Sequence, residues 1–263
     1  MQVLVTGAAR GIGRATCLKL ARDGAVRGQR IGIAAQDAAH RPELDALVAE
    51  LNGLGARAVA LDGDMGNVEA PARAVEQALT ALGGLDGIVS NAGISRPSPL
   101  IEAKLEDWER VFAVNTRATW LLAKAAQPAL AASKGSLVAV ASMSGMYPHP
   151  GLSAYSPSKA AVIMLVKVLA QELAPHGIRA NVVSPGMVRT MMTELVYQDP
   201  VLKAEREEQV PLRRVATPED IAAGICFLLG PEASYVSGEN LLIDGAFTGS
   251  LLGRIPGLAQ LRS

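Results

Sequence analysis

Two side chains that can exchange a proton lie one helical turn apart at the start of an apolar helical pattern. Tyr155 and Lys159 bound the run Tyr155-Ser156-Pro157-Ser158-Lys159, so both face the same side of the helix. A phenol loses its proton at about pH 10, but a neighbouring ammonium favours the phenolate and lowers that pKa. The pair could then exchange a proton with an alcohol or carbonyl oxygen. Taken alone, the spacing also fits an ordinary pair on a helix surface.

Small and polar residues follow three of the predicted strands. Ser142 comes directly after the fifth strand, Asn91-Ala92-Gly93 ends the fourth, and Pro185-Gly186 follows the sixth. Open α/β sheets bind their ligands at the carboxyl ends of the strands, so these residues are expected to line one cleft. The hydroxyl of Ser142 could hold a substrate oxygen there.

A glycine-rich turn joins the first strand to the first helix. It reads Thr6-Gly7-Ala8-Ala9-Arg10-Gly11-Ile12-Gly13, which is looser than the strict G-x-G-x-x-G fingerprint. Glycines let the backbone approach a pyrophosphate closely, and the helix N-terminus supplies N–H groups and positive potential. The turn therefore predicts a dinucleotide site, with a purely structural turn as the alternative.

The end of the second strand bears on which dinucleotide is bound. An acid there would bind the 2′-hydroxyl of NAD, but Ala35 occupies the expected place, and Gln36 and Asp37 follow it. Arg10 in the glycine turn could meet a 2′-phosphate. Both features favour NADP(H) over NAD(H). Because residues 26–30 read as a small insertion, Asp37 is the alternative acid and would favour NAD(H).

Strand and helix patterns alternate along the whole chain, which predicts a parallel sheet covered by helices on both faces. We expect one domain of the doubly wound, Rossmann type with a seven-stranded parallel sheet. The predicted strands are Val3–Val5, Arg30–Ala34, Ala58–Leu61, Gly87–Ser90, Ser136–Ala141, Arg179–Val183 and Asn240–Ile243. The predicted helices are Gly13–Asp23, Glu43–Leu54, Val68–Leu82, Trp108–Ala132, Ser153–Ala174 and Pro218–Leu229.

Two segments depart from this alternation. The polar, Pro-punctuated segment 187–214 is long for a connection and is expected to form a substrate lid with a little helix of its own. Its methionines suggest an apolar, adaptable pocket wall built from Met187, Met191, Met192 and Leu195. The apolar tail 247–263 is expected to pack on a neighbouring surface.

Composition excludes several classes of protein. Lys plus Arg number 25 and Asp plus Glu also number 25, so no net field attracts nucleic acid or an acidic membrane. No apolar run is long enough to span a bilayer, and no signal peptide precedes the first strand. Cys17 and Cys226 lie in apolar helical patterns and are expected to be buried free thiols, which fits a reducing cytoplasm. The three histidines share no metal-ligand spacing, so no metal site is expected.

Taken together, these motifs resemble the classical short-chain dehydrogenase/reductase family, from Val3 to about Gly245. The resemblance implies reversible hydride transfer between a nicotinamide and a secondary alcohol or ketone. It also implies a homotetramer or homodimer that pairs the helices before and after strand five. The implied catalytic residues are Asn115, Ser142, Tyr155 and Lys159. The cofactor-binding residues expected from the motifs and the resemblance are Gly7, Arg10, Gly11, Ile12, Gly13, Asp64, Met65, Asn91, Ala92, Gly93, Tyr155, Lys159, Pro185, Gly186, Val188 and Thr190.

The resemblance also implies individual roles. Asp64 corresponds to the residue that contacts adenine, and Asn115 completes a proton relay through water. Lys159 holds the nicotinamide ribose as well as tuning Tyr155. Val188 and Thr190 match positions that hold the carboxamide and the phosphate.

The expected substrate is a small, apolar carbonyl or alcohol compound, and two other functions stay open. One is 3-oxoacyl-[acyl-carrier-protein] reductase, a branch of the family that usually carries arginines near the cleft mouth to meet the acidic carrier. The corresponding positions here are Ser133 and His176, which disfavours that reading. The other is a protein that binds a dinucleotide without catalysis. Such a protein would not need the complete set of Asn115, Ser142, Tyr155 and Lys159, which disfavours this alternative.

Overall fold

The computed structural model describes residues 1–38, 41–191 and 193–250. Seven parallel strands form one sheet in the order β3-β2-β1-β4-β5-β6-β7, so the chain reverses its direction of growth after β3. This confirms the doubly wound, Rossmann-type architecture expected from the alternating pattern. The strands are β1 (Gln2–Thr6), β2 (Gly32–Asp37), β3 (Arg57–Asp62), β4 (Gly87–Ser90), β5 (Ser136–Val140), β6 (Arg179–Pro185) and β7 (Asn240–Ile243).

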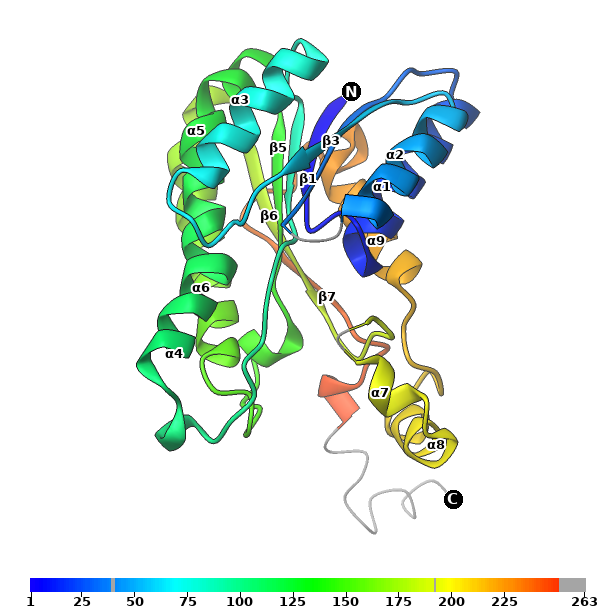
Figure 1. The fold of residues 1–263 in the computed structure, drawn as a ribbon, viewed down its shortest axis with the longest axis vertical. Helices are drawn as coiled ribbons and strands as arrows, with labels where there is room; N and C mark the ends of the chain where they lie inside the picture. Colours follow the sequence, from blue (N-terminus) through cyan, green and yellow to red (C-terminus); the bar gives the residue numbers. More distant parts are fainter. Residues whose placement is uncertain (39–40, 192, 251–263) are drawn as a thin grey trace.

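Helices cover both faces of the sheet (Figure 1). On one side lie α3 (Ala70–Leu82), α5 (Ala118–Ser133) and α6 (Tyr155–Leu173), with α4 (Leu105–Phe112) beyond them. On the other side lie α1 (Gly11–Val26), α2 (Arg41–Gly53) and α9 (Pro218–Leu229). The helices α7 (Glu194–Tyr197) and α8 (Pro200–Gln209) lie past the carboxyl ends of the strands.

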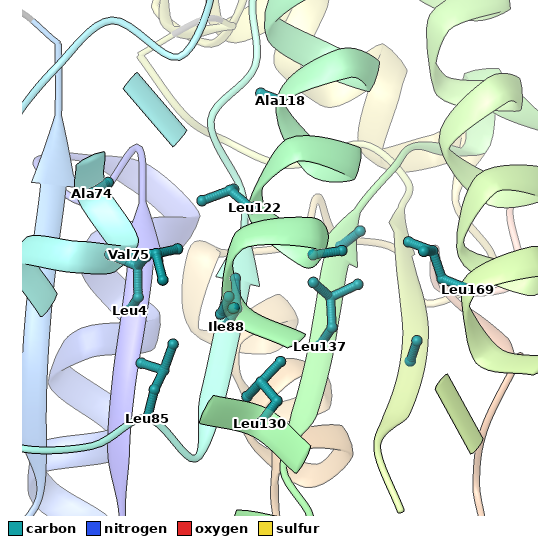
Figure 2. Close-up of a cluster of buried hydrophobic side chains, with 14 of the residues drawn as sticks. Leu4, Ala74, Val75, Leu85, Ile88, Ala118, Leu122, Leu130, Leu137 and Leu169 are labelled. Carbon is teal, nitrogen blue, oxygen red and sulfur yellow. The ribbon is translucent and has the colours of Figure 1, made fainter. Parts of the chain in front are cut away.

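The core is built from aliphatic side chains in two clusters, one on each face of the sheet. Aromatic residues make up only 3% of the chain, so Ala, Val, Leu and Ile fill this space. Figure 2 shows the cluster under α3, α5 and α6, where Ile88 and Leu137 project from the sheet towards Leu122 and Leu130 of α5. Both faces of the central strands are buried, which explains their unbroken apolar sequences.

The second strand begins and ends later than its sequence predicts. The expected range was Arg30–Ala34, but β2 runs from Gly32 to Asp37 and pairs with β3 up to Asp37 and Asp62. The reason is that α1 extends to Val26, so the chain after it needs a longer return before pairing begins. Ala35 and Gln36 therefore lie inside the strand, and Asp37 ends it.

The predicted helix over 108–132 is interrupted. Between α4 and α5 the chain forms one π-helical turn, η2 (Ala113–Arg117), which contains Asn115. Such turns insert an extra residue into a helix and occur often at functional sites. The sequence pattern did not reveal this turn, because it leaves the apolar stripes on either side intact.

The segment 187–214 carries the short helices α7 and α8, as expected. Met192 lies outside the described residues, as does the tail from 251 onward, so the predicted packing of the tail stays untested. Cys17 is buried and Cys226 is partly buried, and both are free thiols as predicted. Within the described part of the chain, no helix is both long and apolar enough to cross a membrane.

Candidate functional site

The glycine loop after β1 has the backbone that its sequence requires. Gly7 and Gly11 adopt positive φ angles of 63° and 52°, a region that side-chain-bearing residues rarely enter. A Cβ on Gly13 would lie 2.2 Å from the carbonyl oxygen of Gly7, so only glycine fits there. The side chain of Arg10, the N-cap residue of α1, does not cap the helix, and the first turn of a helix presents N–H groups that can bind an anion.

Asn91 ties this loop to the end of β4. Its Nδ2 donates to the carbonyl oxygens of Thr6 at 2.9 Å and Gly7 at 3.0 Å. The backbone N–H groups of Asn91 and Ala92 donate to Oγ1 of Thr6 at 3.0 and 3.1 Å. The strand-end motif expected to line the cofactor site thus fixes the shape of the glycine loop.

Asp37, at the end of β2, also lies beside the glycine loop. The backbone N–H of Ala9 donates to Oδ2 of Asp37 at 3.1 Å, so the carboxylate at the end of β2 faces the glycine loop. Arg10, the candidate for a 2′-phosphate, forms an ion pair with Glu43 at 3.1 Å. The buried Gln36 side chain donates to the carbonyl of Gly63 and so belongs to the core.

Asp64, expected at the adenine, follows β3 and is held firmly. Arg110 Nη2 lies 2.7 Å from Oδ1 and 2.6 Å from Oδ2, and the Gly66 N–H donates to Oδ1 at 2.9 Å. Burial alone would raise the pKa of Asp64, but the Gly66 N–H and the Arg110 guanidinium hold it below the ordinary value. The side chain of Met65 is buried in the core cluster, so only its backbone could touch a cofactor.

Tyr155 begins α6 and is partly buried near Ser142, which follows β5. Ser142 caps the short helix η3 (Met143–Gly145), and its Oγ accepts from the N–H of Ser144 at 3.1 Å. Burial raises the pKa of Tyr155 above its ordinary value, while a hydrogen bond with Ser142 acts in the opposite direction. The expected lowering of this pKa by Lys159 is therefore wrong for the protein by itself, because desolvation of the phenolate outweighs the favourable contacts.

Lys159 is the most perturbed base of the site. It is 4% exposed, and burial lowers its pKa from 10.5 to about 8. Its Nζ donates to the carbonyl of Val140 at 2.8 Å and lies 5.7 Å from the centre of the Tyr155 ring. A lysine that holds its proton weakly and sits beside a phenol is suited to proton exchange.

Asn115 joins the cofactor side to the catalytic helix. Its Oδ1 accepts from the Ile94 N–H at 2.9 Å, and its Nδ2 donates to the Ile94 carbonyl at 3.1 Å and to Ser158 Oγ at 3.0 Å. A Cβ on Gly93 would lie 3.3 Å from Lys159 Nζ and 3.4 Å from Asn115 Oδ1. These bonds use both donors and one acceptor site of the Asn115 amide, so the side chain holds the loop and the helix together.

The segment after β6 lies beside the glycine loop. Pro185 ends β6, and a Cβ on Gly186 would lie 2.6 Å from Cβ of Asp244. Val188 is buried and pairs with Ala216 in an isolated bridge. A Cβ on Gly11 would lie 3.6 Å from Cγ2 of Thr190, which places Thr190 against the phosphate-binding turn.

The residues present fit a nicotinamide dinucleotide. Glycine at positions 7 and 13 lets the loop pack closely on itself and on Asn91, so that it turns directly into the N-terminus of α1, the part of a helix that can bind a pyrophosphate. Gly93 leaves space directly beside Lys159 and Asn115, where a ribose hydroxyl could bind. The structure thus brings the predicted residues to the carboxyl edge of β1, β3, β4, β5 and β6.

Ser133 and His176 do not lie at that edge. Ser133 ends α5, and His176 follows α6, whereas Tyr155 begins α6. With 19 residues, α6 is roughly 28 Å long, so both positions lie near the opposite edge of the sheet. The absence of arginine at these positions therefore does not bear on the cleft of the same chain, and that expectation is corrected.

Sequence reasoning missed Arg110, Arg117 and Ser158. Each acts through residues far away in the chain; Arg110 and Asp64, for example, are separated by 46 positions. The sequence has no local signal for such a pair.

Comparison with known proteins identifies relatives along nearly the whole chain. Residues 7–248 match the model of a family described as enoyl-(acyl carrier protein) reductase. A 3-oxoacyl-[acyl-carrier-protein] reductase from Synechocystis sp. is 36% identical over 244 residues, which cover 92% of this chain and 94% of the relative. A cyclopentanol dehydrogenase from Comamonas sp. is 36% identical over 247 residues, covering 94% and 96%.

Solved structures agree. A blue fluorescent protein from a metagenomic library, in complex with NADPH, superposes with a TM-score of 0.83 at 35% identity, covering 93% of this chain and 96% of that one. A short chain dehydrogenase from Burkholderia cenocepacia in complex with NADP gives a TM-score of 0.84 at 34% identity, with coverage of 93% and 96%. The fold, the site and these relatives agree: the chain belongs to the short-chain dehydrogenase/reductase family and is an oxidoreductase that transfers a hydride between a nicotinamide dinucleotide and a CH–OH or carbonyl group.

Proposed function

We propose that this enzyme interconverts a small, apolar secondary alcohol and its ketone, with Tyr155 as the acid and base. The observation that carries this proposal is the meeting of Ser142, Tyr155 and the buried Lys159 at one point of the sheet edge. A bound nicotinamide supplies or accepts the hydride at its C4 atom.

The chain's own residues perform the proton chemistry. In ketone reduction, Ser142 Oγ and the Tyr155 hydroxyl donate hydrogen bonds to the carbonyl oxygen and polarise it. The Tyr155 proton moves to that oxygen as the alkoxide forms. Lys159, whose pKa burial lowers to about 8, stabilises the phenolate and restores its proton. Alcohol oxidation follows the same steps in reverse.

Asn115 keeps these groups in place. Its amide links Ile94 to Ser158, and Ser158 Oγ donates to the carbonyl of Tyr155 at 2.7 Å. The proposed relay of protons through water would start from Lys159 and end near this asparagine. Around them, the glycine loop and Thr190 would hold the phosphates, and Val188 would hold the carboxamide through its backbone.

We propose NADP(H) as the preferred cofactor. Arg10 stands in the glycine loop, and the two solved relatives described above were obtained with NADPH and NADP. Asp37 opposes this choice, because a carboxylate beside the loop favours a ribose hydroxyl over a 2′-phosphate. Titration of the enzyme and its Arg10→Ala and Asp37→Ala variants with NADPH and NADH decides between them. Tighter NADH binding by the unmodified enzyme would contradict the preference.

The segment 187–214 is proposed to act as the lid over the substrate. Between this segment and the end of β7 lies a hollow whose lining includes none of the proposed catalytic residues. Its walls are built by the apolar or small residues Met187, Val210, Leu212, Ala216, Ile243 and Gly245, with the charged residues Arg214, Asp220 and Asp244 beside them. Its largely apolar lining supports a small apolar substrate. The cation of this wall, Arg214, is half-exposed and forms an ion pair with Asp220, which also lines the hollow.

Transfer of deuterium tests the reaction. We expect NADPH deuterated at C4 to deliver its label to the carbinol carbon of a ketone drawn from a panel of cyclic and linear compounds. Mass spectrometry of the alcohol reads the label. Tight NADPH binding with no labelled product from any ketone would favour the dinucleotide-binding protein without catalysis.

A second candidate is reduction of a 3-oxoacyl group on its carrier protein. It is supported by the relative from Synechocystis sp. and by the carrier-protein wording of the matching family. Acetoacetyl carrier protein, assayed beside free ketones of the same size, separates the two. Faster reduction of the carrier-bound substrate would replace the leading proposal.

We further propose a homo-oligomer that works in the reducing cytoplasm. Trp120 of α5 and Met164 and Val168 of α6 are 46%, 60% and 45% exposed, which offers an apolar surface for a second copy. The free thiols of Cys17 and Cys226 suit a reducing compartment.

A further inference from the structure

Two arginines that flank Asn115 in the sequence bind the turn after β3. Arg110, in the last turn of α4, binds both carboxylate oxygens of Asp64, and Arg117 donates to the backbone carbonyl of Gly66. Both arginines come from the continuous helical stretch that carries the π-turn. The turn at 64–66 is therefore attached to the helix of a catalytic-site residue.

Gly66 leaves the space that the Arg110 guanidinium occupies. A Cβ on Gly66 would lie 1.7 Å from Nη1 of Arg110 and 3.1 Å from Cγ2 of Val114. The guanidinium lies directly against the turn, so a side chain at position 66 would displace it from its place beside Asp64. The N–H of Gly66 donates to Asp64 Oδ1, so the carboxylate is fixed from two independent directions.

Sheet order places Asp64 at the adenine end of the cofactor. The glycine loop follows β1, and the helix with Tyr155 and Lys159 follows β5. In the order β3-β2-β1-β4-β5, a dinucleotide with its pyrophosphate on the loop and its nicotinamide beside Lys159 extends its adenine towards β3. Asp64 lies two residues beyond the end of that strand.

We propose that Arg110 is a positioning residue for cofactor binding, which aims the Asp64 carboxylate at the exocyclic amine of adenine. Arg110 does not touch the cofactor; it acts through Asp64 and needs the space provided by Gly66. Because this role rests on the proposed function, the test includes a cofactor that lacks adenine.

The test compares NADPH with reduced nicotinamide mononucleotide in four variants. We expect Arg110→Gln to weaken NADPH binding about tenfold, as for loss of one oriented charge-assisted hydrogen bond. Gly66→Ala should weaken it similarly, because the new methyl group displaces the guanidinium without removing a charge. Arg110→Lys should recover part of the loss. Arg27→Gln, which removes the distant ion pair with Glu232, is the matched control and should leave binding unchanged.

Two readouts separate positioning from general damage. The kcat with saturating NADPH should stay within about twofold of the unmodified enzyme, and the KM for reduced nicotinamide mononucleotide should not change. Combining Arg110→Gln with Asp64→Asn should cost no more than the larger single effect, since the two residues act as a unit. Fluorescence titration measures the affinities.

Equal weakening of both cofactors would show that Arg110 only supports the fold, and would overturn the proposal. Unchanged NADPH affinity in both Arg110→Gln and Gly66→Ala would overturn it as well. If Arg110→Gln does not fold, Gly66→Ala and Arg110→Lys carry the same comparison. Failure of the unmodified enzyme to bind NADPH would contradict the proposed function itself, and this role with it.

Discussion

At the scale of single residues, burial of Lys159 destabilises the folded chain at neutral pH, while the proposed mechanism depends on it. The ammonium is 4% exposed and has one protein hydrogen bond, to the carbonyl of Val140. Burial disfavours its charged form and lowers its pKa from 10.5 to about 8. The folded chain therefore carries a group that would be more stable in water, a cost that the proposed proton exchange with Tyr155 would explain.

This cost has a defined pH window. Between about pH 8 and 10.5 the unfolded chain binds more protons at Lys159 than the folded chain, so stability rises with pH through this range. Below pH 8 both states are protonated and the cost is fully present, about 3 kcal/mol at most.

We predict that Lys159→Met abolishes turnover and raises the thermal midpoint at pH 7. The variant should also lose the rise in stability between pH 8 and 10.5. Thermal melts at a series of pH values measure both effects, with Lys104→Met, an exposed lysine that precedes α4 and lies outside the proposed subunit contact, as the control. A lower midpoint for Lys159→Met at pH 7 would show that the buried ammonium is stabilising.

At the scale of elements, the sequence predicted correctly those helices and strands whose ends are marked by local motifs. The bounds of α9 were predicted without error, because Thr217-Pro218-Glu219-Asp220 is a complete N-terminal signal. Thr217 accepts from the Asp220 N–H, and Asp220 Oδ2 accepts from the Thr217 N–H at 2.8 Å. The pairing with Arg214 and these bonds hold the pKa of Asp220 at about 2.

Other elements could not be found this way. The π-turn that presents Asn115 inserts one residue without changing the apolar pattern around it. The end of β2 at Asp37 depends on pairing with β3 and on the length of α1, and both are tertiary properties. The ion pair between Arg110 and Asp64 forms only when two distant segments meet in the fold. The candidate catalytic residues could therefore be predicted from the sequence, but the contacts that position the residues around them could not.

We predict that Thr217→Ala lowers the free energy of unfolding by about 1 kcal/mol, because α9 packs on α1 and the sheet and its cap contributes to global stability. Urea denaturation measures the change. Asp199→Ala removes the matching cap of α8, a helix with no buried residue in the described structure, and should leave global stability unchanged. Equal losses in the two variants would show that α8 unfolds together with the core.

At the scale of the whole molecule, a parallel sheet brings the site together. Residues from the ends of β1, β3, β4, β5 and β6 share one edge because every strand runs in the same direction. The helix α6 carries Tyr155 and Lys159 and also the exposed apolar side chains Met164 and Val168, while the exposed Trp120 lies on α5. The catalytic helix and the proposed subunit contact are thus the same element.

We predict that Met164→Glu splits the oligomer into smaller species, because a buried carboxylate without a partner is costly at an interface. Light scattering coupled to size exclusion measures the mass. Met191→Glu, on the equally exposed lid segment, is the control and should keep the assembly intact. An unchanged mass for Met164→Glu would place the contact elsewhere or exclude it.

The central claim is that Tyr155 moves the proton while the cofactor moves the hydride. The direct measurement is the turnover and the NADPH affinity of Tyr155→Phe, with Tyr147→Phe in the neighbouring loop as the control. We predict that Tyr155→Phe loses turnover by about a thousandfold while its NADPH dissociation constant stays within a few fold, since only the acid and base is removed. Turnover at the level of the unmodified enzyme in Tyr155→Phe would contradict the mechanism.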